Sequence, residues 1–158
     1  MNKETLIELL RDYKENKAKL NIKLKELKTA RINLKSNDFE TSITSMFGIN
    51  QDIHSKNKIS NKVLAKVEDN EKKKEEAEQK IEDLEKEVRE LREKVDLIDD
   101  RLAALKYREK ELLIAYHVEG RTYSDIGNNL YFKLFNQTRD ADTIKDIVGK
   151  ATEKMLKL

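Results

Sequence analysis

The sequence predicts an all-helical protein in which a coiled-coil segment precedes a small three-helix domain. Of the 158 residues 41% are charged and only 6% are aromatic, a composition typical of coiled coils. The chain contains no proline and only four glycines, so little interrupts a helix. Apolar residues also recur at helical spacing along most of the chain. We therefore expect an N-terminal amphipathic helix over residues 1–35, a loop over 36–58, a coiled-coil helix over 59–105 and a helix-turn-helix domain over 106–158.

The first helix is expected to run from about Lys3 to Leu34, with Asn2 as its N-terminal cap. Its apolar residues follow alternating steps of four and three, which is the spacing of a heptad seam. They are Leu6, Leu10, Tyr13, Leu20, Leu24, Leu27 and Leu34.

Residues 36–58 lose this period and are rich in serine, asparagine and threonine, so they predict a loop. A short helical element is expected around residues 39–46. The apolar side chains of this segment are expected to cover a helix seam.

The second helix, expected to begin near Ser60, has the strongest signal in the chain. Mostly β-branched residues at heptad position a and mostly leucine at d favour a two-stranded coiled coil. In a parallel homodimer, four of the five flanking charge pairs would also be attractive. The predicted dimer interface consists of Ile81, Leu84, Val88, Leu91, Val95, Ile98, Leu102 and Leu105.

The charge distribution leaves two arrangements of these helices open. Residues 13–35 contain eight basic and two acidic residues, whereas residues 61–105 contain eleven basic and fifteen acidic residues. The first helix could therefore fold back antiparallel on the second. The alternative is a simple parallel dimer, and a dimer of hairpins would use both pairings.

After Leu105 the pattern becomes that of short helices around one small core. A first helix ends at Gly120, and Thr122 is a capping candidate for the next. A last helix is expected from about Asp142, with an apolar stripe on one side. This order predicts a helix-turn-helix domain. The stripe consists of Ile144, Ile147, Val148, Ala151, Met155 and Leu156.

The same segment resembles a known family of domains. REKELLIAYHVEGRTYSDIGNNL is similar to region 4 of sigma factors, and TIKDIVGKATEKMLKL resembles the recognition helix of that domain. Together with the preceding coiled coil, the layout resembles phage late-gene regulators of the ArpU and RinA kind. The resemblance implies a phage or prophage transcriptional regulator that binds promoter DNA as a dimer, together with RNA polymerase.

The resemblance also implies where DNA would bind. The last helix would enter the major groove through its N-terminal residues, and the start of the preceding helix would lie near phosphates. Lys154 joins this set because we expect it to share a face with the other lysines of the last helix. Arg139 could read base edges or make a polar turn. The predicted DNA-binding residues are Arg121, Thr122, Tyr123, Arg139, Thr143, Lys145, Asp146, Lys150 and Lys154.

Two features depart from the family pattern. The twelve residues 131–142 are longer than the linker of sigma-like domains, and are expected to extend the second helix or form an apolar flap. Asp140, Asp142 and Asp146 at the groove entrance would be repelled by phosphate. They favour an alternative function, a protein-interaction module that docks on polymerase or another regulator. A packaging factor like a small terminase subunit is a third reading.

Other classes of function lack the residues they need. Without cysteine there are no disulfides or thiolate zinc sites, and His54 and His117 lie in separate segments, so neither metal nor cofactor is expected. A glycine-rich phosphate loop and a catalytic constellation are absent, so we expect no enzyme. The charged N-terminus is unlike a signal peptide and no apolar run approaches the length of a membrane span. We expect a cytoplasmic protein.

Overall fold

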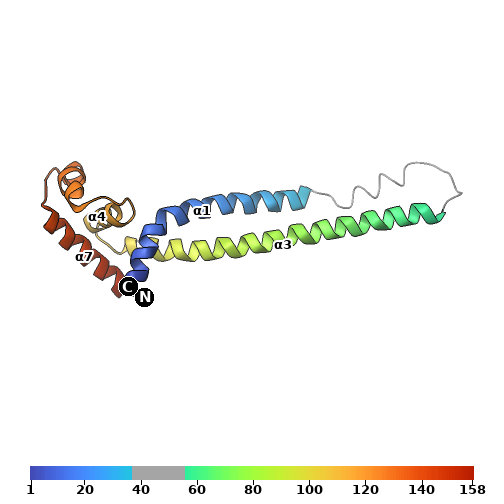
Figure 1. The fold of residues 1–158 in the computed structure, drawn as a ribbon, viewed down its shortest axis with the longest axis horizontal. Coiled ribbons are helices and arrows are strands. Elements are labelled where there is room, and N and C mark those ends of the chain that lie inside the picture. Colours follow the sequence, from blue (N-terminus) through green and yellow to red (C-terminus); the bar gives the residue numbers. More distant parts are fainter. Residues whose placement is uncertain (37–55) are drawn as a thin grey trace. The chain divides into compact units, whose positions relative to one another are not determined.

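A computed structural model of the chain describes residues 1–36 and 56–158, with the side chains of the second long helix described from Val67 onward. Throughout these ranges the regular structure is helical and includes no strand, which confirms that the fold is all-helical. The elements are α1 (Lys3–Ser36), α3 (Lys56–Ala103), α4 (Tyr107–His117), α5 (Tyr123–Asp125), the π-helical turn η1 (Ile126–Leu130), α6 (Tyr131–Phe135) and α7 (Ala141–Lys157) (Figure 1).

The predicted helix boundaries agree with these bounds to within a few residues. The helix α3 begins at Lys56 rather than near Ser60, and residues 56–59 contain no helix breaker. The short element expected around residues 39–46 lies outside the described residues. No helix in the described ranges is both long and apolar enough to cross a membrane.

The chain divides into two compact units. The first comprises residues 1–21 and 90–158, and the second comprises residues 22–89. We call the first unit the head and the second the arm. Each is described by itself below.

In the arm, the second part of α1 runs antiparallel to α3 (Figure 1). Leu27, Leu84 and Val88 are buried between the two helices. Lys23 Nζ lies 3.0 Å from a carboxylate oxygen of Glu87 across this pair. A second pair joins Arg31 Nη2 to Glu85 Oε1 at 2.7 Å. Such exposed pairs each contribute only about 0–1 kcal/mol, so burial of the leucines contributes more to holding the arm.

In the head, the first part of α1 packs on the last turns of α3. Leu6, Leu10 and Ile98 are completely buried, and Leu102 is 2% exposed. The antiparallel pairing within one chain, which the sequence left open, therefore occurs in the described residues. It covers seam residues that were assigned to a homodimer, and the homodimer itself stays a prediction.

A polar contact reinforces this pairing. The hydroxyl of Tyr13 on α1 donates a hydrogen bond to a carboxylate oxygen of Asp99 on α3, and Lys17 Nζ lies 3.5 Å from the same carboxylate. Burial raises the pKa of Tyr13, and the hydrogen bond to Asp99 raises it further.

Helices α4 and α7 complete the same apolar cluster. Leu105, Leu113, Ala151 and Met155 pack with the buried leucines of α1 and α3. Arg101 of α3 also donates a hydrogen bond to the backbone carbonyl of Met155. The head thus contains the start of α1, the end of α3 and all of residues 106–158, and the predicted domain boundary after Leu105 falls inside it.

A second cluster contains other residues of α4 and the first half of the buried stripe of α7. It joins them to the continuous helical segment formed by α5, η1 and α6. Its members are Leu112, Ala115, Ile126, Tyr131, Ile144 and Val148. Helices α4 and α7 contribute to both clusters. The packing of α1 in the first cluster and the packing of residues 123–135 in the second therefore depend on the same two helices.

Candidate nucleic-acid interface

The turn between α4 and α5 begins the candidate interface. Gly120 ends the α4 region with a φ of +70°, a left-handed conformation that glycine adopts without strain. Thr122 then caps α5, and its side-chain oxygen accepts a hydrogen bond from the backbone N–H of Asp125 at 3.2 Å. Both the glycine stop and the threonine cap were predicted, and both are confirmed.

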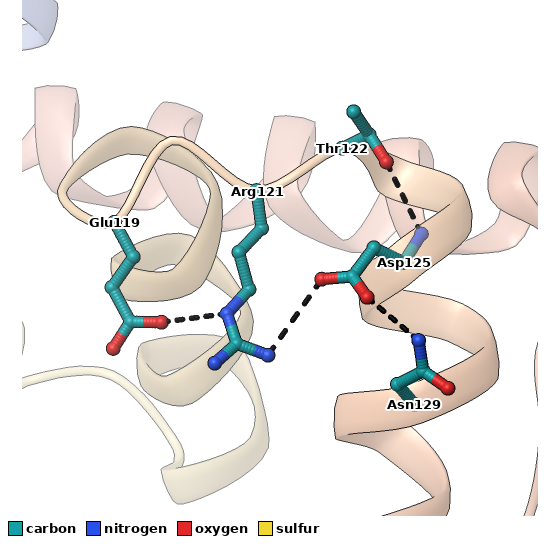
Figure 2. A network of polar contacts seen from close by, with 5 residues as sticks. All are labelled: Glu119, Arg121, Thr122, Asp125 and Asn129. Carbon is teal, nitrogen blue, oxygen red and sulfur yellow. Dashed lines mark hydrogen bonds and ion pairs between the residues drawn. The ribbon is translucent and has the colours of Figure 1, made fainter.

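The side chain of Arg121 is held by carboxylates on both sides of this turn (Figure 2). Its Nε donates to Glu119 Oε2 at 2.8 Å, and its Nη1 lies 3.7 Å from Asp125 Oδ2. Asp125 also accepts a hydrogen bond from the side-chain amide of Asn129 at 2.7 Å. These contacts fix the guanidinium in one orientation and partly neutralise its charge.

A close backbone contact fixes the loop ahead of α7. The N–H of Arg139 donates to the carbonyl of Gly127 at 3.2 Å. A Cβ atom on Gly127 would stand 2.1 Å from the carbonyl oxygen of Arg139, which is far inside van der Waals contact. Glycine is therefore required at position 127 for the loop to cross η1 this closely.

Residues 131–135 continue the preceding helix, so of the two expectations for this insertion the helical extension is confirmed. The helix ends at Asn136, which has a left-handed φ of +53°. Tyr131 is fully buried, and among the described residues its hydroxyl has no hydrogen-bond partner. The guanidinium of Arg108 lies 4.9 Å from the ring centroid of Phe135 and 5.5 Å from that of Tyr131.

Two aromatic side chains, one in this segment and one at the start of α4, remain exposed. Tyr107 is 61% exposed and Phe132 is 53% exposed. The ring of Tyr107 meets that of Phe135 edge-on, with 6.3 Å between their centroids. We call Tyr107, Phe132 and Phe135 the aromatic patch.

The N-terminus of α7 is capped by Asp140. Its carboxylate accepts the backbone N–H of Thr143 at 2.7 Å and the hydroxyl of the same residue at 2.9 Å. The backbone hydrogen bond from Thr143 is the main reason that the pKa of Asp140 lies below its ordinary value. The hydroxyl of Thr143, predicted to face DNA, is therefore already engaged as a donor.

The outer face of α7 carries charges of both signs. Lys145 and Lys150 are exposed and form no ion pair with any residue that the structure describes. They lie about 140° apart around the helix axis. Asp142 and Asp146 occupy the surface between them. The expectation that the lysines of α7 share one face is wrong, because a spacing of five residues does not return to the same side.

Lys154 belongs to a different environment. Its ammonium group forms an ion pair with Glu109 of α4, and this hydrogen bond is the main reason that the pKa of Glu109 is lowered. The backbone N–H of Lys106 also donates to Glu109, at 3.3 Å. Lys154 therefore links α7 to α4.

Next to Arg121 lies an open cleft of about 690 Å³. Tyr116 and Tyr123 line it with stacked rings, 4.1 Å between centroids, and His117 meets Tyr116 edge-on at 4.8 Å. Burial raises the pKa of Tyr123, with a further contribution from Tyr116. Arg11 of α1 also lines the cleft. Burial lowers the pKa of His117, and the positive charge of Arg11 lowers it further.

The predicted site residues thus form two groups. Arg121, Thr122 and Tyr123 line the cleft, whereas the predicted residues from Thr143 to Lys154 lie on α7 and Arg139 lies in the loop before its cap. Reasoning from sequence missed Arg11, because a single arginine on a heptad helix gives no signal of the segment it meets. It also missed Gly127, because a glycine inside a helical pattern does not by itself show which backbone segment crosses it.

The described residues contain no cluster of three or more potential metal ligands. Comparison with protein-family models, with curated proteins and with solved structures gives no match for this chain.

Proposed function

We propose that this protein is a DNA-binding transcriptional regulator, sigma factor-like and of phage or prophage type, that acts on promoter DNA with RNA polymerase. The main support for the proposal is that one side of α7 is exposed to solvent. This helix buries Ile144, Val148, Ala151 and Met155 and exposes its opposite side over its whole length. An α-helix with side chains is about 10–12 Å wide, which matches the major groove of B-DNA.

The residues on the exposed side of α7 have distinct roles in this proposal. Lys145 and Lys150, which have no ion-pair partner in the described ranges, supply positive charge on the two flanks of the helix. Such lysines contact the phosphates on either side of a groove and give salt-dependent affinity. Asp146 lies between them and can accept a hydrogen bond from the amino group of cytosine. The acidic centre then contributes to sequence choice rather than to affinity.

Loop packing supports the same role. The contact between Gly127 and Arg139 fixes the loop that leads into α7, and Asp140 caps the helix where this loop ends. A recognition helix must be held rigidly relative to the helix before it, because base contacts depend on sub-ångström placement.

The test is selection of a duplex from random-sequence DNA, followed by fluorescence-anisotropy titrations at several salt concentrations. The double variant Lys145→Ala/Lys150→Ala should weaken binding by ten-fold or more. It should also reduce the salt slope by about two, one for each phosphate contact. The matched control Lys72→Ala/Lys86→Ala removes two exposed lysines from α3 and should leave binding unchanged. Absence of DNA binding by the wild type at low salt would refute the proposal.

The homodimer is part of this proposal, because two heads on one duplex would read two half-sites. The seam of α3 is covered by α1 in a single chain, so a dimer of hairpins would use other apolar residues. Ile22 and Ile32, 55% and 53% exposed on α1, are the candidates. Sedimentation analysis of an Ile22→Ser/Ile32→Ser variant tests this: the wild type should sediment as a dimer and the variant as a monomer.

A second function, docking on polymerase or another regulator without DNA, is favoured by the aromatic patch. Exposed aromatic residues beside an arginine are typical of protein interfaces. If this function is the correct one, RNA polymerase will bind the purified protein in nuclease-treated samples, and Tyr107→Ser/Phe132→Ser will abolish binding while the α7 lysine variant will not.

A further inference from the structure

Two arginines line the cleft beside Arg121, counting Arg121 itself, and they differ in their ion-pair and hydrogen-bond partners. Arg121 is held by Glu119 and Asp125, whereas Arg11 has no hydrogen-bond or ion-pair partner among the described residues. Arg11 comes from α1 and Arg121 from the turn after α4, so the cleft is lined by segments about a hundred residues apart in the chain. His117 lies in the same lining.

The lining favours an anion. Its one carboxylate, that of Glu119, is occupied by the Nε of Arg121 at 2.8 Å. The positive charges of Arg11 and of Lys3, which also belongs to α1, both act on His117. A guanidinium without a partner presents planar pairs of N–H donors that match the oxygens of a phosphate.

The position of the cleft indicates the source of such a phosphate. Thr122 and Tyr123, which line it, begin the helical segment whose later residues hold the loop ahead of α7. Segments of this kind contact the DNA backbone when the following helix lies in a groove.

We infer that the cleft binds a phosphate group of the DNA backbone, with Arg11 as its main ligand and Arg121 as a second, pre-oriented one. The inference rests on the proposed function and deepens it, because it makes α1 a part of the DNA-binding surface. The N-terminal helix then has two roles in the head: Leu6 and Leu10 complete the core, and the next residue, Arg11, contacts the nucleic acid.

The first test measures DNA affinity by the anisotropy titration described above. Arg11→Gln removes the charge and keeps a polar side chain, and Lys14→Gln is the matched control, one turn further along α1 and also exposed. Arg11→Gln should weaken binding about five- to ten-fold and lower the salt slope by about one, whereas Lys14→Gln should change neither. Equal affinities and slopes for the two variants would overturn the inference. Unchanged thermal unfolding of both variants shows that the fold is intact.

The second test needs no DNA. Inorganic phosphate is titrated into the wild type while the ring-proton signals of the two histidines are followed by NMR. The signal of His117 should shift saturably and that of His54 should not, and Arg11→Gln should abolish the shift. No shift, or an equal shift for both histidines, would count against a phosphate site.

The two tests separate the inference from the function on which it rests. DNA binding that is insensitive to Arg11→Gln, without a His117 shift, leaves the proposed function in place and removes the inference. A specific His117 shift in a protein that binds no DNA leaves a phosphate site and removes the proposed function.

Discussion

The arm and the head are built from the same two long helices, yet they are held together in different ways. In the arm, buried apolar residues such as Leu27, Leu84 and Val88 retain 6–7% exposure, and the ion pairs between the helices are exposed. In the head, Leu6 and Leu10 are completely buried, because α4 and α7 enclose the same helix pair. A heptad seam therefore determines which side of a helix is buried, while the stability of the helix pair depends on which other helices cover that seam.

The largest effect is expected where α1 enters the head. Leu10→Ala should lower the free energy of unfolding by about 2–5 kcal/mol, because it leaves a cavity among fully buried side chains. Leu24→Ala in the arm, at a half-buried seam position, should cost clearly less. Urea unfolding monitored by circular dichroism provides both values. Equal losses in the free energy of unfolding would show that the head and the arm are packed equally well.

The next effect concerns the loop that leads into α7. Gly127→Ala should destabilise the head by about 1–3 kcal/mol, because the added methyl group collides with the carbonyl oxygen of Arg139. Gly149→Ala is the matched control within α7, where an added Cβ meets no atom within 4 Å. It should stabilise the protein by up to about 1 kcal/mol through helix propensity. Thermal unfolding of the two variants should therefore shift in opposite directions.

A substitution at Tyr131 is expected to stabilise the protein, by less than Gly127→Ala destabilises it. Its hydroxyl is buried without a hydrogen-bond partner in the described part of the chain. Tyr131→Phe should raise the free energy of unfolding by about 1 kcal/mol, because the desolvated hydroxyl is removed while the ring packing is kept. A loss of stability on the same urea curve would mean that the hydroxyl has a partner after all.

The head should also respond to pH through His117, for which the arm has no counterpart among its described residues. Burial lowers the pKa of His117 below its ordinary value of 6.5. As the pH falls below about 6.5, His117 takes up a proton in the unfolded chain but not yet in the folded chain. The free energy of unfolding therefore decreases as the pH falls toward the pKa that His117 has in the folded protein. Urea midpoints between about pH 7.5 and 5.5 should fall for the wild type and stay flatter for His117→Gln.

The smallest effect is expected in the arm. Lys23→Ala removes the exposed ion pair with Glu87 and should lower the free energy of unfolding only slightly, with the difference vanishing at high salt. A loss comparable to that of Leu10→Ala would show that charge, rather than apolar burial, holds the arm.

Much of the fold could be predicted from local patterns. Periodicity indicated the long helices, and the capping residues Asn2 and Thr122 and the left-handed Gly120 occupy their predicted roles. The entry of α1 into the head could not be predicted, since Leu6 and Leu10 continue a regular seam whatever covers it. The same holds for Arg11, which reaches the cleft only through that packing. Arg121 was predicted beside phosphates, and its restraint by Glu119 and Asp125 is a tertiary detail of the turn.

Hydrogen–deuterium exchange of the 158-residue chain, with and without a selected DNA duplex, is the most direct test of whether α7 contacts DNA. Binding through the head should protect backbone amides in residues 141–150 and 116–123 and leave those in residues 67–89 unchanged. Protection confined to the arm, or no change in α7 at saturating DNA, would contradict the assignment of α7 as the element that meets DNA.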